Sequence, residues 1–222
     1  MRFAALETSS DWCSVALWLD GEIRSVEERV PNGHSARVLP MLHTLLKNSG
    51  LKIEALEAIA FGAGPGAFTG LRIACGISQG LAFARGLPVA AVSSFEAIAQ
   101  ESGAPRVAAC IDARMREVYY AALERVDGRW REVVPGRCIA PEAAEPPPGE
   151  GWVGCGSGFA AFPSFLHNKI SSVSSNVHPT ALSIAQLAAP RLLAGEGVDA
   201  ASALPVYLRD KVALTQAELA GR

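Results

Sequence analysis

The sequence predicts an α/β protein with two lobes, and two observations support this prediction. A pattern of strand, acidic residue, tight turn, strand, hairpin and strand occurs in residues 2–30 and again in residues 106–139. Between the two copies, short apolar strands alternate with helical segments, which is typical of α/β architecture. The recurrence indicates an internal repeat of topology rather than of residues. We therefore expect lobes at residues 1–103 and 104–222, and we leave open whether the final segment packs back on the first lobe.

Each copy of the pattern contains an acidic residue at the end of its first strand and a later Asp-Gly hairpin. The first copy has a strand that ends in Glu7, and the second has a strand that ends in Asp112. The later hairpins fall at Asp20-Gly21 and at Asp127-Gly128. An Asp-Gly pair predicts a tight hairpin because it favours the backbone angles of a type I′ turn.

Helices are predicted where apolar residues recur at three- and four-residue spacing. The first covers residues 34–48. A second follows a short buried strand and should be capped by Ser93 or Ser94, since a hydroxyl at that position accepts a bond from a free backbone N–H. A third covers residues 179–193, with Thr180 as its cap.

The stretch of residues 62–86 combines a glycine-rich loop with a helix of small residues. A strand, a glycine loop and a helix N-terminus present backbone N–H groups that suit an anion. We expect Thr69 to cap this helix and Gly86 to end it. A glycine inside a helix costs roughly 1 kcal/mol against alanine. Gly76 and Gly80 therefore indicate that another backbone comes very close to this helix.

Several enzyme motifs match this stretch only in part. The lysine-bearing phosphate loop is excluded because no lysine occurs between Lys52 and Lys169. The dinucleotide-binding pattern lacks its acid about 20 residues further on. Residues 76–80 match G-x-S-x-G, so a serine hydrolase that uses Ser78, with Asp112 and either His167 or His178, is one alternative. The other reading of Ser78 is a small residue in the middle of a helix.

The two strand-end acids, Glu7 and Asp112, suggest another kind of chemistry. Two equivalent strand–acid–turn units are how the actin-like ATPase fold presents its phosphate-binding hairpins and a metal-binding acid. An autonomous actin-like ATPase is therefore a further alternative, and solvated strand ends are the simpler reading. The four histidines include no pair at i and i+4, so we predict no metal site.

Composition argues against several classes of function. The formal net charge is −2 and only four residues are lysine, so no basic stripe supports nucleic-acid binding by the chain alone. The five cysteines form no C-x-x-C pair, which favours reduced core thiols in a cytoplasmic protein. No apolar run reaches membrane-spanning length, and Glu7 comes too early for a signal peptide.

The sequence resembles the bacterial TsaB (YeaZ) family in six short motifs, or blocks, that occur in order along the chain. They are Glu7-Thr-Ser-Ser with Ser14-Val-Ala-Leu17, His34-Ser35 with Leu39-Pro40, Gly64-Pro-Gly-Ala-Phe-Thr-Gly-Leu-Arg-Ile73, Val92-Ser-Ser-Phe-Glu96, Asp112-Ala-Arg with Glu117-Val-Tyr119, and Pro205-Val-Tyr-Leu-Arg-Asp-Lys-Val212. The resemblance implies a two-lobed actin/Hsp70-like fold (ASKHA, ribonuclease H-like). It also implies a part in making threonylcarbamoyladenosine in tRNA, beside a catalytic subunit of similar fold, TsaD.

The resemblance further implies a subunit that is not an enzyme by itself. The metal-binding histidines of TsaD are absent from the corresponding residues 94–98. The family usually has Asp where this chain has Glu7. We therefore expect no catalytic residue, no metal and no cofactor, with ATP or ADP binding possible only in the assembled complex. Vestigial phosphate loops are expected at Glu7, Thr8, Ser9, Gly64, Gly66 and Asp112.

Partners are implied in the same way. Family members pair two helices with TsaD or with a second copy of themselves. We expect that interface here, a TsaE ATPase subunit in the ternary complex, a homodimer when the chain is alone, tRNA contacted mainly by the complex, and no membrane. The expected interface residues are His34, Arg37, Val38, Met41, Leu42, Leu45, Phe68, Gly70, Ile73, Ala74, Ile77, Gly80 and Leu81.

Overall fold

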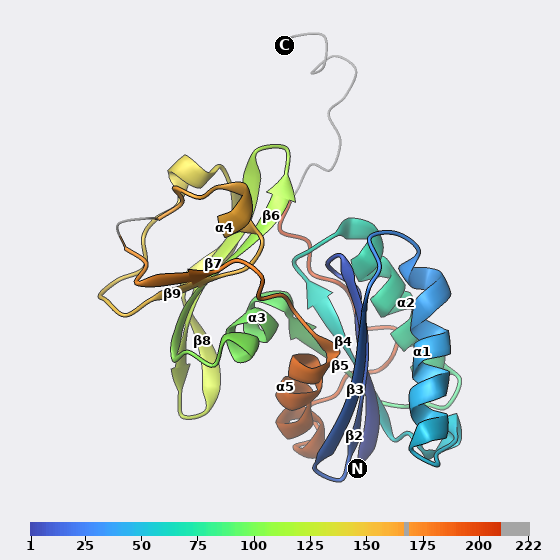
Figure 1. The fold of residues 1–222 in the computed structure, drawn as a ribbon. Coiled ribbons are helices and arrows are strands. Elements are labelled where there is room, and N and C mark those ends of the chain that lie inside the picture. The colour runs from blue at the N-terminus through green and yellow to red at the C-terminus, as the bar shows by residue number, and fades with distance from the viewer. Residues whose placement is uncertain (167–168, 210–222) are drawn as a thin grey trace.

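Two lobes lie side by side in the computed structural model, each built on a five-stranded mixed sheet (Figure 1). The structure describes residues 1–166 and 169–209. His167 and the end of the last resembling block, from Asp210 on, therefore lie outside the described residues. Within the described ranges, no helix is long and apolar enough to cross a membrane.

The first sheet has the strand order β3-β2-β1-β4-β5. Its strands are β1 (Arg2–Glu7), β2 (Trp12–Leu19), β3 (Glu22–Arg29), β4 (Ala58–Gly64) and β5 (Val89–Ser93). Strands β1, β2 and β3 form the predicted antiparallel meander. Strand β4 runs parallel to β1, and β5 runs parallel to β4.

Helices cover both faces of the first sheet because its inner strands are apolar on both sides. Helices α1 (His34–Asn48) and α2 (Phe68–Phe83) pack on the face that carries Leu6 and Phe61. Helix α5 (Ala181–Leu193) packs on the opposite face, which carries Phe3 and Ala60. Helix α5 follows the second sheet in the chain, so the chain returns to the first lobe. A short 3₁₀ turn, η1 (Ile53–Ala55), precedes β4.

The second sheet has the order β10-β9-β6-β7-β8. Its strands are β6 (Arg106–Arg114), β7 (Glu117–Val126), β8 (Arg129–Ile139), β9 (Val153–Cys155) and β10 (Ser172–Ser174). A 3₁₀ turn, η2 (Pro141–Ala143), follows β8. One face packs on α3 (Ser94–Ser102) and the other on the short α4 (Gly158–Ala161).

The internal repeat is confirmed by strand order. Read from its meander edge, the second sheet runs β8-β7-β6-β9-β10, which matches β3-β2-β1-β4-β5 strand for strand. The two hairpins also correspond, since Asp20 and Asp127 have φ angles of 52° and 50°, in the left-handed region. The predicted fold class, a duplicated two-lobed α/β fold, is therefore correct.

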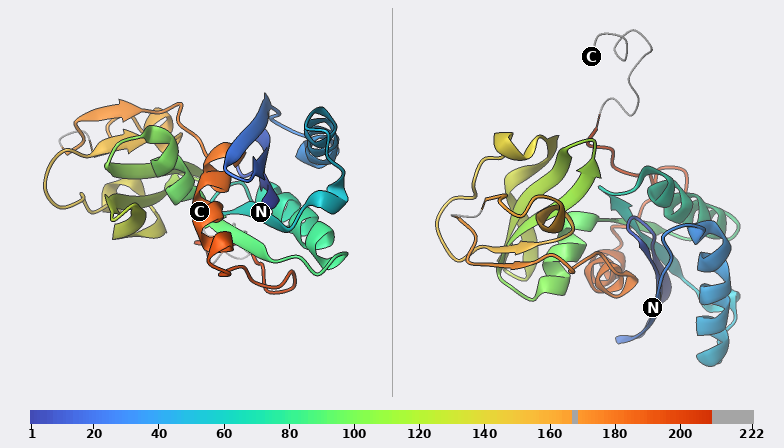
Figure 2. Two further views of the ribbon diagram at one scale, coloured as in Figure 1. Left: turned by 90° about the horizontal axis from the view of Figure 1, so that it is seen from below. Right: turned by 45° about the horizontal axis from the view of Figure 1, so that its top comes forward.

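Helices α3 and α5 lie at the junction of the lobes (Figure 2). Phe95 and Ile98 of α3 belong to the core of the second lobe, although α3 directly follows β5 of the first. Gln100 of α3 accepts a bond from Trp130 Nε1 at 3.2 Å and donates one to Gln186 of α5 at 2.9 Å. This helix therefore joins the two lobes.

Two predicted caps are confirmed and one is wrong. Ser93 accepts a bond from the N–H of Phe95, and Thr180 accepts one from Ser183 in a capping box. The predicted cap at Thr69 is wrong, because α2 already begins at Phe68 and has no side-chain cap. The N–H of Ala67 donates to the Ser9 carbonyl at 2.8 Å. That bond fixes Ala67 as the extended residue before the helix.

Candidate functional site: the interlobe cleft and the outer face of α2

Glu7 lies at the end of β1, but its carboxyl group does not reach the cleft between the lobes. The side chain is fully buried. Its Oε1 accepts a bond from the N–H of Ser9 at 2.5 Å, and its Oε2 has no hydrogen-bond partner among the described residues. Burial raises the pKa of Glu7 to about 7, because the charged form loses its hydration, and bonds from Ser9 and Thr8 lower it in part.

The loop glycines are covered by the chain itself. A Cβ at Gly66 would lie 2.6 Å from the Cβ of Ser9, and a Cβ at Gly70 would lie 1.9 Å from the carbonyl oxygen of Thr8. The Thr8 hydroxyl donates to the Gly70 carbonyl at 2.7 Å. Gly64, with a φ of 114°, lies against the carbonyl oxygen of Val206. These glycines therefore allow two loops to pack closely. The interpretation of the glycine loop as an anion-binding site did not anticipate this packing.

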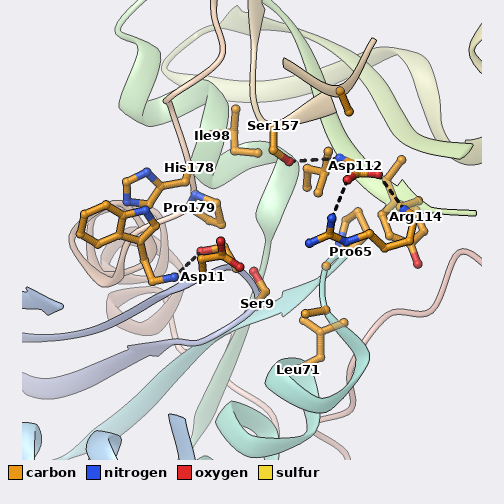
Figure 3. Close-up of a pocket in the computed structure, with 18 of the residues that line it drawn as sticks. Ser9, Asp11, Pro65, Leu71, Ile98, Asp112, Arg114, Ser157, His178 and Pro179 are labelled. Carbon is orange, nitrogen blue, oxygen red and sulfur yellow. Dashed lines mark hydrogen bonds and ion pairs between the residues drawn. The ribbon is translucent and has the colours of Figure 1, made fainter. Parts of the chain in front are cut away.

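A cavity of about 840 Å³ separates the lobes (Figure 3). Ser9, Pro65 and Leu71 line it from the first lobe, and Asp112, Arg114 and Ser157 line it from the second. Its size is in the range of small-molecule sites. The cleft is thus the place where this architecture would hold a ligand.

The second predicted acid, Asp112, faces the cleft, but its own neighbours engage it. Its Oδ1 accepts a bond from the N–H of Arg114 at 2.8 Å, and its Oδ2 pairs with the Arg114 guanidinium at 3.1 Å. Its N–H donates to Ser157 Oγ at 3.1 Å. Across residues 1–166 and 169–209, no three His, Cys, Asp or Glu side chains are arranged to hold a metal.

One cluster in the cleft wall was missed by sequence reasoning. His178 stacks on Trp12, with ring centroids 4.8 Å apart and planes at 7°. Its Nε2 lies 3.1 Å from a carboxylate oxygen of Glu27 on β3. Glu27 and His178 are 151 positions apart, so no local pattern could have revealed this contact. His178 thereby holds the segment before α5 against the first lobe.

The predicted hydrolase nucleophile is not placed for catalysis. Ser78 lies in the middle of α2 and is fully buried, and its hydroxyl has no hydrogen-bond partner in the part of the chain that the structure describes. A nucleophile elbow needs a sharp turn between a strand and a helix. Because the G-x-S-x-G match lies within continuous helix, that interpretation is wrong.

The predicted interface residues divide into two groups. The apolar ridge of α1 packs on the first sheet, and His34, Gly70 and Ala74 are also buried inside the chain. Seven of the predicted residues are buried within the chain, and they are His34, Val38, Met41, Leu42, Leu45, Gly70 and Ala74. The remaining six, Arg37, Phe68, Ile73, Ile77, Gly80 and Leu81, are exposed or half-buried.

The outer face of α2 is open. Apart from neighbouring residues of α2 itself, no described atom lies within 4 Å of a Cβ placed at Gly76 or Gly80. Ile73 and Ile77, which are half-buried, flank these glycines. The predicted close approach of another backbone is thus not made by the described part of this chain. Leu39 of α1 is also exposed, at 46%.

The duplicated sheets and the cleft between them define a two-lobed protein of the actin-like (ASKHA) class. Residues 26–216 match the family described as "TsaD: tRNA N6-adenosine threonylcarbamoyltransferase". The chain is 38% identical to the tRNA threonylcarbamoyladenosine biosynthesis protein TsaB of Haemophilus influenzae, over 100% of this chain and 98% of that protein. It is 39% identical to TsaB of Escherichia coli, over 96% of both. The structure of YeaZ from Pseudomonas aeruginosa aligns with a TM-score of 0.86 and 42% identity, over 93% of this chain and 99% of that one. The chain belongs to the TsaB family.

Proposed function

We propose that this chain is a non-catalytic subunit in the synthesis of N6-threonylcarbamoyladenosine in tRNA. The printed names of its relatives, the H. influenzae and E. coli TsaB proteins, support the pathway. Support for a non-catalytic role comes from the cleft. Glu7 is buried away from the cavity, and Asp112 is paired with Arg114. Neither acid is free to hold a metal and a phosphate together.

The proposed partner is a TsaD catalytic subunit docked on the outer face of α2 and the adjoining part of α1. The observation that carries this is the open pair Gly76 and Gly80, flanked by Ile73 and Ile77. Glycines on an exposed helix face let a second helix approach closely. They are otherwise unfavourable by roughly 1 kcal/mol each. A homodimer through the same face is proposed for the chain alone.

The rest of the assembly follows from this proposal. A TsaE ATPase joins the pair in a cytoplasmic complex, tRNA is contacted mainly by the complex, and ATP or ADP binds only once the complex has formed. The chain's net charge of −2 supports this division, since strong nucleic-acid binding by a subunit alone usually requires a basic protein.

The test introduces a charge where space is available. Gly76→Arg should fold normally, because the position is exposed and arginine favours helix. It should nevertheless abolish co-purification with the catalytic subunit, since it would bury an unpaired charge in the interface. Reconstituted tRNA modification, measured by mass spectrometry of nucleosides, should fall with it.

The matched control is Leu193→Arg, which adds the same charge at a 62% exposed position at the end of α5. This variant should bind and support modification as the wild type does. Wild-type binding by a folded Gly76→Arg chain would refute the proposed interface. Modification at full rate without this subunit would refute the proposed role.

A further inference from the structure

An extended segment, residues 203–209, crosses from the first lobe to the second, and we refer to it as the strap. On the first lobe it runs along α2. The Ala203 carbonyl accepts bonds from Cys75 Sγ at 3.3 Å and from Gln79 Nε2 at 3.0 Å. Arg72 Nε donates to the Tyr207 hydroxyl at 3.1 Å. The N–H of Val206 donates to the Ala63 carbonyl at 2.7 Å. Contacts spread along its length thus hold this half of the strap.

The second lobe holds only the end of the strap. Leu208 packs against the core of that lobe, next to Gly136. The Arg209 guanidinium pairs with Glu117 at 2.6 Å and donates to the Arg114 carbonyl at 3.3 Å. The Arg209 side chain is only 15% exposed, so this ion pair is better shielded from water than an ordinary surface pair.

The attachment to the second lobe is incompletely satisfied. Arg209 Nε is buried without a hydrogen-bond partner in the described residues. A buried donor left unpaired opposes the state that buries it. Beside Leu208 the packing is close, since a Cβ at Gly136 would lie 2.7 Å from Phe95 Cε2 and 3.5 Å from Leu208 Cδ1. The second-lobe attachment therefore carries the cost of one unpaired buried donor.

The strap also forms part of the cleft wall, because residues 206–209 line the cavity. Away from the strap, α3 packs against both sheets and joins the lobes independently. Release of the strap from the second lobe would thus open one wall of the cleft and leave the lobes connected.

We propose that the strap is a gate on the interlobe cleft, latched to the second lobe by Arg209 and Leu208. With the latch closed, the lobes keep the arrangement seen in the structure. With the latch open, the cleft widens about α3 while both lobes stay folded. Because the strap lies along α2, events on that helix are coupled to the width of the cleft. The gate rests on these contacts and does not depend on the identity of any partner.

The test measures the width of the cleft in the full chain. Spin labels are attached through a ketone-bearing residue introduced at Ala67 and Ala160, two exposed cleft positions on opposite lobes, so that all native cysteines remain. Electron–electron double resonance should give one narrow distance distribution for the wild type. Arg209→Ala and the isosteric Glu117→Gln should give longer and broader distributions.

The matched control is Arg131→Ala, which removes an ion pair with Glu124 on the same sheet, away from the strap. Its distance distribution should equal that of the wild type. Circular dichroism establishes that each variant is folded. If Arg209→Ala unfolds the chain, the distance distribution of Glu117→Gln tests the gate instead. An unchanged distribution in the folded latch variants, including Leu208→Ala with Glu117→Gln, overturns the gate.

Discussion

Glu7 and Gly62 share one space at the base of the glycine loop: a Cβ built on Gly62 would lie 1.7 Å from Glu7 Oε2. Glu7 is fully buried on β1, and Gly62 lies beside it on β4. The longer acid at this position therefore turns into the interior, where the absence of a side chain at Gly62 admits it. This relationship explains why the first strand-end acid is not available to the cleft.

Gly62→Ala should destabilise the chain by about 3 kcal/mol, because overpacking a rigid core forces the side chain and backbone to shift. Glu7→Asp shortens the acid and should recover most of the loss in the double variant. Urea unfolding of the four chains of this cycle measures the coupling. Additive effects of the two substitutions would show that the residues do not compete for space.

The stability of the chain should depend on pH through Glu7. Its pKa is raised to about 7 in the folded protein from an ordinary value of 4.5. The folded state therefore keeps a proton that the unfolded state loses between these pH values, and this group's contribution is fully present below pH 4.5. It is lost as pH rises to about 7, by a few kcal/mol at most.

Glu7→Gln isolates this contribution, because glutamine keeps the shape of the side chain and does not titrate. The free energy of unfolding of the wild type relative to Glu7→Gln should fall from pH 5 to pH 8. All other carboxylates are common to both proteins and cancel in the difference. A difference that stays constant over this range would mean that Glu7 ionises normally.

Much of the fold was predictable because its determinants are local. The Asp-Gly hairpins and the caps at Ser93 and Thr180 are short-range signals, and the structure contains them all. Of the two acids predicted to end strands, Glu7 ends β1, whereas β6 continues past Asp112 to Arg114. The apolar ridge of α1 shows the limit. Spacing reveals that a helix has an apolar face, but it does not reveal that the chain's own sheet covers it.

The candidate site was less predictable because its contacts join distant parts of the chain. Glycines in a loop satisfy a phosphate motif and a close-packing role equally well, and only the positions of Ser9 and Thr8 distinguish the two at Gly66 and Gly70. The strap has no periodicity, and the ion pair of Arg209 with Glu117 spans 92 positions. No local pattern identifies such a pair.

The isolated chain should show no magnesium-dependent ATP binding. Glu7 is buried and Asp112 is paired with Arg114, so neither of the two predicted strand-end acids is free to hold the metal beside the phosphates. Isothermal calorimetry with ATP, with and without Mg²⁺, measures this. A saturable heat that requires Mg²⁺ would establish an autonomous nucleotide site and contradict the reading of the cleft as vestigial.

Ser78→Ala should leave the chain slightly more stable, by roughly 1 kcal/mol. The hydroxyl is fully buried and has no hydrogen-bond partner within residues 1–166 and 169–209, so its removal relieves a desolvation cost. Alanine also favours helix more than serine does. Ser183→Ala is the matched control, since this equally buried serine belongs to the capping box of α5, and its loss should destabilise. Urea midpoints compare the two variants.

An organophosphate serine probe should not label Ser78, because the side chain is inaccessible in the folded protein. Labelling that disappears in Ser78→Ala would show that the Ser78 hydroxyl is accessible and reactive. Destabilisation of Ser78→Ala as large as that of Ser183→Ala would show that the Ser78 hydroxyl makes a stabilising hydrogen bond.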